Sequence, residues 1–155
     1  MPTVSRTFAV SPPPDLVVGY LKDFRNAEQW DPGTQRCERI DSGPVAEGAY
    51  WHNTSKIFGF TTELTYELEE LTDRKVVFVG ENQSSRTIDT ITVDAQGAGS
   101  VITYVADLEM QGTAKLLNPV MKLVFEKLAG DVEKQMTAVL NKLPTAKSQP
   151  GGASR

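Results

Sequence analysis

The chain has 155 residues, of which 39% are hydrophobic and 23% charged, and its formal net charge at pH 7 is −4. This length suffices for one domain with its own hydrophobic core, and the negative charge argues against nucleic acid as a partner. There is no signal-peptide pattern and no apolar run of about 18 residues, so we predict a cytoplasmic protein without a membrane span.

The chain has one cysteine and one histidine, which limits the disulfide and metal chemistry that it can support. Cys37 is the only cysteine, which excludes an internal disulfide and is typical of a reduced cytosolic thiol. His52 is the only histidine, so a histidine-based metal cluster is excluded and we expect neither a metal nor a cofactor.

The N-terminal part predicts one strand followed by two short helices. Apolar residues alternate along Thr3–Val10, as they do in a half-buried strand. The three prolines that follow break this strand, and a helix begins near Pro13 or Pro14 and ends near Asp23. A shorter helix, Asn26–Trp30, precedes the turn residues Asp31-Pro32-Gly33.

From Gln35 onward the apolar residues recur with a period of two, which predicts strands. Short joints with turn residues separate them, so the strands form an antiparallel meander. The predicted strands are Gln35–Asp41, Ala49–Lys56, Phe60–Leu71, Lys75–Glu81, Arg86–Asp94 and Ser100–Met110. Within Phe60–Leu71, Leu64 and Tyr66 share one face, and Glu63 and Glu67 share the other, which we expect to face solvent.

The last element is a long amphipathic helix, Asn118–Leu143, whose apolar residues recur at steps of three and four. Asn118 and Pro119 fit the N-cap and the first helical position, and Pro144 ends the helix. Such a helix is about 37 Å long, so a short helix pair could not cover its apolar face, whereas a wide, curved sheet could. We expect the first strand to lie beside the last strand or the second. The domain spans residues 1–143, and the polar tail 144–155 is predicted to be disordered.

This order of elements, with several short motifs, resembles the START/Bet v 1-like (SRPBCC) superfamily, in particular its bacterial polyketide cyclase/dehydrase-like branch. The resemblance covers Val4–Leu143. Its motifs are Val10-Ser-Pro-Pro-Pro-Asp-Leu-Val-Val, Trp30-Asp-Pro, Gly48, Tyr66-Glu-Leu, Arg74-Lys-Val-Val-Phe-Val-Gly80 and Gly99-Ser-Val-Ile-Thr-Tyr104. The resemblance implies an α+β helix-grip fold: a curved, antiparallel seven-stranded sheet wraps a long C-terminal helix, two short helices follow the first strand, and a hydrophobic cavity lies between sheet and helix.

A set of large apolar side chains comes from separate elements that this fold would bring together. We expect them to line the cavity, although each could equally fill a packed core. The candidates are Trp30, Trp51, Tyr66, Phe78, Tyr104, Leu117, Met121 and Phe125. The hydroxyls of Tyr66 and Tyr104 could orient a ligand there.

No catalytic arrangement is recognisable in the sequence. A lone histidine on a strand, such as His52, is more often structural or exposed than catalytic. Asp89 and Asp107 could point either way, and outward placement is favoured, because a buried carboxylate needs a partner or a raised pKa. An inward, desolvated His52 or Asp89 would favour an enzyme.

Three functions remain open. The favoured one is binding of a small hydrophobic ligand, such as a lipid or a polyketide, by a carrier, sensor or sequestering protein that is a monomer or a dimer. The alternative is a cyclase or dehydrase-like enzyme, with His52 or a tyrosine as the acid/base group. The third is a protein-interaction module with a fully packed interior and no ligand.

Overall fold

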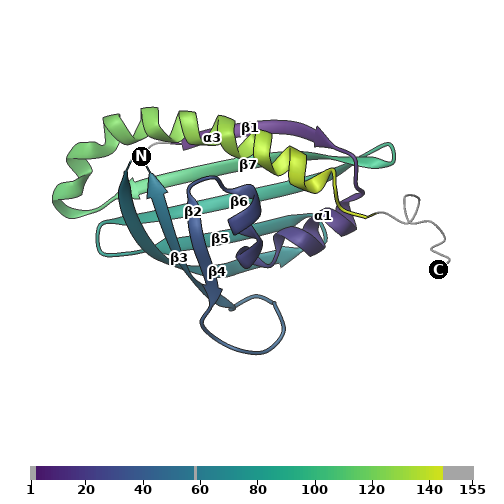
Figure 1. Ribbon diagram of the computed structural model, residues 1–155, viewed down its shortest axis with the longest axis horizontal. Helices are drawn as coiled ribbons and strands as arrows, with labels where there is room; N and C mark the ends of the chain where they lie inside the picture. The colour runs from purple at the N-terminus through teal and green to yellow at the C-terminus, as the bar shows by residue number, and fades with distance from the viewer. Residues whose placement is uncertain (1–2, 58, 145–155) are drawn as a thin grey trace.

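In the computed structural model, which describes residues 3–57 and 59–144 except for the side chains of Leu117 and Asn118, a curved sheet lies beneath a long helix (Figure 1). The sheet has seven antiparallel strands in the order β1-β7-β6-β5-β4-β3-β2. The strands are β1 (Thr3–Val10), β2 (Thr34–Arg39), β3 (Tyr50–Ile57), β4 (Phe60–Thr72), β5 (Lys75–Glu81), β6 (Ser85–Gln96) and β7 (Gly99–Met110). The predicted strands are confirmed, with their ends shifted by no more than two residues.

The first strand lies beside the last one, which is one of the two positions predicted for it. In the pairing of β1 with β7, Thr3 lies opposite Asp107 and Val10 lies opposite Ser100. The remaining strands follow one another as a meander, so β1 and β2 are the two edges of the sheet. The sheet therefore curves without closing into a barrel.

The α-helices follow the predicted order, and the 3₁₀ helices between them are not predicted by the sequence pattern. They are α1 (Pro14–Leu21), the 3₁₀ helix η1 (Phe24–Asn26), α2 (Ala27–Trp30), the 3₁₀ helix η2 (Gly112–Leu117) and α3 (Asn118–Leu140). α3 ends three residues before the predicted Leu143, and tighter turns follow: the Leu143 N–H donates to the Leu140 carbonyl at 3.0 Å. Pro144 limits how far the helix can extend, because proline disfavours a helical backbone in the residue before it, Leu143.

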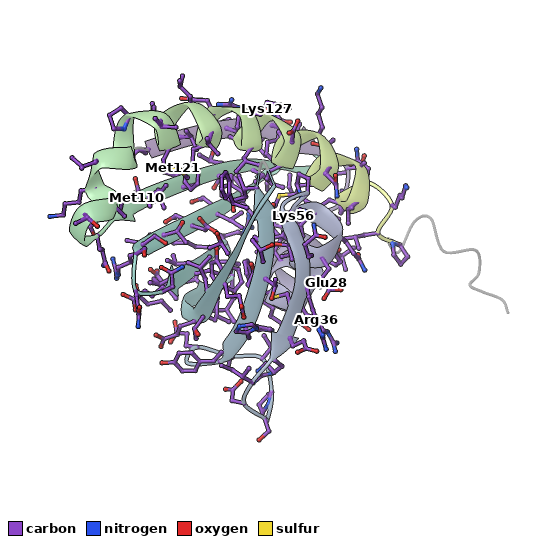
Figure 2. All side chains as sticks on the ribbon, turned by 60° about the vertical axis from the view of Figure 1, so that its left-hand side comes forward. Glu28, Arg36, Lys56, Met110, Met121 and Lys127 are labelled. Atoms are coloured by element: carbon purple, nitrogen blue, oxygen red, sulfur yellow. The ribbon has the colours of Figure 1, made fainter. Side chains whose placement is uncertain are left out.

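α3 lies along β1 and is tied to it by polar contacts. One guanidinium nitrogen of Arg6, Nη2, donates to the Glu126 carbonyl at 3.2 Å, and Nε lies 3.8 Å from Oε1 of Glu133. Near the start of the helix, Lys122 Nζ donates to the Thr3 carbonyl at 2.7 Å. These contacts place the apolar side of α3 over the Leu64 and Tyr66 face of the sheet, opposite the face that carries Glu63. Figure 2 shows Lys127 pointing to solvent on the side of α3 away from Met121.

At one end of the sheet, the short helices and the second half of α3 close over a packed aromatic core. The Phe24 ring lies at its centre, 4.5 Å from the ring of Phe78 and 6.3 Å from that of Trp51. Trp30 packs edge-on against the same Phe24 ring at 6.0 Å. From α3, Met136 and Leu140 complete this core and are fully buried.

Two further expectations concern the C-terminal tail and membrane-spanning helices. The predicted disordered tail lies outside the described residues from position 145 onward, so it stays a prediction. No helix within the described ranges combines the length and the apolar character that a membrane crossing requires.

Candidate functional site

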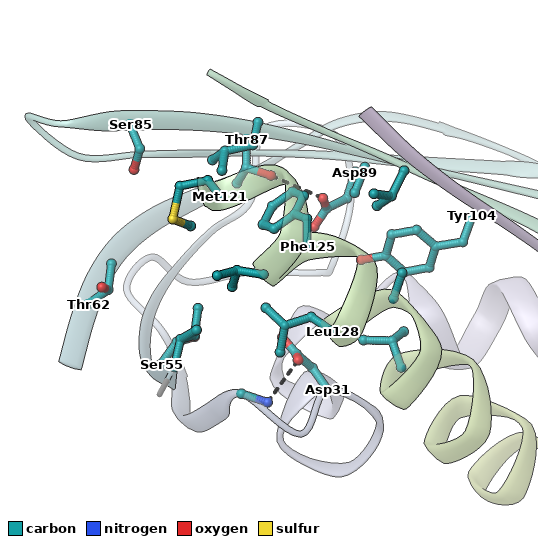
Figure 3. A pocket seen from close by; sticks show the side chains of 18 of the residues that line it. Asp31, Ser55, Thr62, Ser85, Thr87, Asp89, Tyr104, Met121, Phe125 and Leu128 are labelled. Carbon is teal, nitrogen blue, oxygen red and sulfur yellow. Dashed lines mark hydrogen bonds between the residues drawn. The ribbon is translucent and has the colours of Figure 1, made fainter. Parts of the chain in front are cut away.

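Between the first half of α3 and the sheet lies a cavity of about 560 Å³. This volume falls within the range of about 300–1,000 Å³ that is typical of small-molecule sites. α3 supplies the apolar wall on one side, through Met121, Val124, Phe125, Leu128 and Val132 (Figure 3).

The cavity lining follows from the periodicity of the elements around it. Along the end of β7, every second residue borders the cavity: Ala106, Leu108 and Met110. On β1, Val4 and Phe8 border it. Their neighbours in sequence point to the other face, as the pleat of a strand requires. The sequence pattern therefore selects which side chains reach the cavity.

The cavity has an exposed end and a buried end. Phe60 and Val120 border it although 77% and 56% of their surface is exposed, which marks the exposed end between the β3–β4 turn and the start of α3. At the other end, polar groups stand in front of the packed aromatic core: the carboxyls of Asp31 and Asp89 and the phenols of Tyr66 and Tyr104. The cavity is thus apolar along its wall and polar at its inner end.

Asp89 and Tyr104 come together through the strand register. Asp89 on β6 lies opposite Ala106 on β7, and Tyr104 lies two residues from Ala106 on the same face. Such diagonal neighbours can be spanned by a long side chain, and hydrogen bonding by the Tyr104 hydroxyl lowers the pKa of the Asp89 carboxyl. The Thr87 hydroxyl donates to Oδ1 of Asp89 at 3.2 Å (Figure 3).

Asp31 is held by the turn that follows α2. Its Oδ1 accepts from the Gly33 N–H at 3.0 Å, and its Oδ2 accepts from the Thr34 hydroxyl at 2.9 Å (Figure 3). This is the local hydrogen bonding by which an aspartate stabilises a turn. The turn fixes the carboxyl at the edge of the cavity, where burial raises its pKa above the ordinary value and the two hydrogen bonds oppose that rise.

Tyr66 lies flat across the neighbouring strand because Gly80 has no side chain. A Cβ atom at Gly80 would lie only 2.6 Å from a carbon of the Tyr66 ring, so the ring occupies the space that any other residue would fill. Tyr66 is 8% exposed, and its hydroxyl has no hydrogen-bond partner in the part of the chain that the structure describes.

The inner end of the cavity favours neutral forms of its polar groups. Burial raises the pKa of Asp89 to about 7, and the nearby charge of Asp31 adds to the rise, while hydrogen bonds from Thr87 and Tyr104 oppose it. The phenol pKa values of Tyr66 and Tyr104 are raised well above 10, first by burial and then by Asp89. Both tyrosines are therefore neutral hydrogen-bond donors near neutral pH.

The structure brings together some of the residues predicted to line the cavity. Tyr66, Tyr104, Met121 and Phe125 border it. The Leu117 side chain lies outside the described part of the chain. Those that do not border it are Trp30, Trp51 and Phe78, which belong to the packed core. Their position has a physical reason: α1, η1 and α2 fold over that end of the sheet, and Phe24 packs against all three rings.

The structure shows which face of the sheet carries His52, Asp107 and Asp89. His52 lies on the outer face, 40% exposed, with Nε2 2.8 Å from Oε1 of Glu63. Asp107 is also outward and accepts a hydrogen bond from the Thr3 hydroxyl. Asp89 points inward, against the favoured expectation. It shares the inward face of β6 with the buried Ile91 and Val93.

Asp31 was not predicted as a site residue, although it stands in the Trp30-Asp31-Pro32 motif. Only the fold shows that this turn faces the cavity. Cys37 is buried away from it, and burial raises the pKa of the thiol to about 12, so it is a poor nucleophile. Among the described residues, no group of three or more His, Cys, Asp or Glu side chains is arranged to hold a metal ion.

Comparisons with known proteins agree on the architecture. A START superfamily protein from Mycobacterium smegmatis has a TM-score of 0.77 at 13% identity, covering 92% of this chain and 99% of that one. The Zhui aromatase/cyclase from a Streptomyces species has a TM-score of 0.70 at 14% identity, covering 98% and 96%. The major latex-like protein 151 from Panax ginseng has a TM-score of 0.69 at 14% identity, covering 92% and 97%.

At these identities the structural neighbours show the fold alone, and no curated protein matches the sequence. The family itself is shown by the sequence, because residues 1–146 match the family described as polyketide cyclase/dehydrase and lipid transport. The chain, with its helix-grip fold, therefore belongs to this family of the START/Bet v 1-like superfamily.

Proposed function

We propose that the protein binds a small hydrophobic ligand, such as a lipid or a polyketide, inside the cavity and acts as a carrier, sensor or sequestering protein in the cytoplasm. The observation that carries this proposal is the contrast along α3: its first half turns an apolar face toward empty space, whereas its second half is packed. Burying apolar surface contributes about 25 cal/mol per Å². A ligand on this wall would therefore gain affinity without any rearrangement of the core.

Native mass spectrometry of freshly purified protein provides the first test. We expect a mass adduct from a co-purified small molecule that disappears on denaturation. Titration with Nile red, a neutral apolar dye, should show saturable fluorescence enhancement. If neither a co-purified ligand nor dye binding is seen, the domain is better described as an interaction module.

Two adjacent positions on α3 supply a matched pair of variants. Val124 borders the cavity, whereas Leu123 is 74% exposed on the other side of the helix. The substitution Val124→Trp should fill the cavity and abolish Nile red binding, and Leu123→Trp should leave it unchanged. Equal loss in both variants, or loss in neither, would contradict a binding site at this wall.

One observation favours a second candidate, a cyclase or dehydrase-like enzyme. Asp89 points into the cavity with a pKa of about 7, the value at which a carboxylate is an effective general base near neutral pH. It could take a proton from a carbon next to a ligand carbonyl, while the Tyr66 hydroxyl, which also borders the cavity, donates a hydrogen bond to the enolate oxygen that forms. An enzyme of this kind would turn over a poly-β-ketone in a manner that Asp89→Asn abolishes, without loss of Nile red binding.

A further inference from the structure

The charged groups around the cavity are not balanced. Arg6 borders it, but its guanidinium group is already paired with Glu126 and Glu133 of α3. Asp31 and Asp89 also border it, and in the described ranges neither makes an ion pair. Among the described residues, the inner end therefore holds two carboxyls and no unpaired cation. A buried negative charge without a counter-charge is unfavourable, so this end would be stabilised by a positively charged group.

An independent observation points to a missing hydrogen-bond partner at the same place. The Tyr66 side chain is more than nine-tenths buried, borders the cavity, and has no hydrogen bond in the described part of the chain. Its pKa responds first to burial and then to Asp89 and Asp31, so the phenol lies near both carboxyls. The hydroxyl can therefore form a hydrogen bond with a ligand in the cavity.

We propose that the ligand is a hydrophobic amine, an inference that rests on the proposed function. The protonated nitrogen donates to the carboxylates of Asp31 and Asp89 and to the Tyr66 oxygen. The apolar part of the ligand lies against Phe125 and Leu128. An ammonium group has three N–H donors, which matches these three acceptors. A carboxylate headgroup would meet two like charges and no cation, and an alcohol would supply a single donor.

The protonation of Asp89 couples to this binding. The titratable and charged groups around it are Asp31 after α2, Tyr66 on β4, Tyr104 and Asp107 on β7, and the Arg6–Glu133 pair of β1 and α3 that also borders the cavity. Because Asp89 must be ionised to attract a cation, amine binding should strengthen between about pH 6 and about pH 8. Alcohol binding should not depend on pH in this range.

Three ligands with the same chain and different headgroups test the proposal: dodecylamine, dodecan-1-ol and dodecanoic acid. Each displaces Nile red from the unmodified protein, below its micelle concentration. We expect dodecylamine to bind at least about tenfold more tightly than the alcohol at about pH 8, and the acid to bind more weakly than the alcohol. Equal affinities, or a preference for the acid, would overturn the amine proposal while leaving ligand binding intact. If neither Nile red nor any of the three ligands binds, the proposed function itself fails.

A pair of charge-removing variants places the effect at the inner end. Asp89→Asn should lower the affinity for dodecylamine about tenfold and remove its pH dependence, with little change for the alcohol. Asp107→Asn, the same substitution on the outer face of the neighbouring strand, should keep the preference for dodecylamine over the alcohol. Circular dichroism checks that each variant is folded. Loss of amine preference in both variants, or in neither, would contradict the assignment to Asp89.

Discussion

The two halves of α3 carry the same kind of apolar periodicity and meet different surroundings. In the second half, Met136 and Leu140 are fully buried against the aromatic core. In the first half, Met121, Phe125 and Leu128 are only half-buried and face the cavity. A helical pattern thus determines which side of the helix faces the sheet, but it does not determine whether that side meets packed atoms or empty space.

The two halves of α3 differ in whether short helices pack between α3 and the sheet. α2 packs against the second half of α3, where Gln135 Nε2 donates to the Gln29 carbonyl at 2.9 Å. α1 lies at this same end of the sheet (Figure 1). Within the described residues, no helix is inserted beneath the first half. The short helices after β1 therefore divide the interior into a packed half and a hollow half.

The largest difference between the halves should come from Phe78→Ala. Phe78 is fully buried in the packed half, so its removal leaves a void and should lower the free energy of unfolding by about 3–5 kcal/mol. Urea denaturation measures this loss, and Nile red titration of the folded variant should show that the cavity still binds the dye. A loss below about 1 kcal/mol would mean that the packed half is also hollow.

Asp89→Asn should raise stability where a packed-core substitution lowers it. The pKa of Asp89 is about 7 in the folded protein, above its value of about 3.9 in an unfolded chain. Between these values the native state holds a proton that the unfolded state has lost, so stability falls as pH rises and the fall is complete above about pH 7. Above that pH the variant should be more stable than the unmodified protein by roughly 2–4 kcal/mol.

Denaturation of the ligand-free protein at several pH values measures this difference. The gain of Asp89→Asn should vanish below about pH 4, where the carboxyl is protonated in both states. A variant less stable than the unmodified protein at every pH would show that the carboxyl is not held at a desolvated site.

Phe125→Ala is the counterpart of Phe78→Ala in the hollow half. Part of the Phe125 ring already lacks protein neighbours, so fewer packing contacts are lost and the cost should be about 1–2 kcal/mol. Nile red affinity should change in this variant, because the wall of the cavity has moved. If Phe125→Ala costs as much as Phe78→Ala and the protein binds no apolar dye, the two halves are equally packed.

Gly130→Ala should have the smallest effect, at the point where the two halves of α3 meet. No heavy atom lies within 4 Å of the position that a Cβ would take there. Since alanine favours a helix by about 1 kcal/mol over glycine, the variant should be stabilised by up to that amount. Thermal unfolding measures it, and a destabilised variant would show that α3 needs the glycine for a bend.

The sequence determines the fold more completely than the site, for a physical reason. Elements follow from periodicity and turn residues, which are local, so the strands and the short helices are predictable within about two residues. The position of β1 beside β7 was one of two alternatives, because edge pairing depends on residues far apart in the chain. The predicted end of α3 lies three residues too far along the chain, because the apolar Leu143 fits the helical period although it belongs to the turn after the helix.

Within the site, the position of a residue is predictable where one element decides it. The periodicity of α3 places Met121 and Phe125 at the cavity. The placement of Trp30, Trp51 and Phe78 depends on how Phe24 packs, which no single pattern contains. Asp89 is ambiguous on its own strand because the outward Ile88 is as apolar as the inward Ile91, so only the three-dimensional register resolves its direction.

The flat position of Tyr66 over Gly80 has an evolutionary consequence. The ring and the missing side chain occupy the same space, so the two positions cannot vary independently. A larger residue at position 80 would force the ring up into the cavity and remove room from a ligand, unless position 66 became smaller at the same time. Such pairs have non-additive energies, because each residue sets the shape that the other must fit. In this chain a glycine on β5 thereby helps to set the depth of a cavity whose wall is formed by a helix far away in sequence.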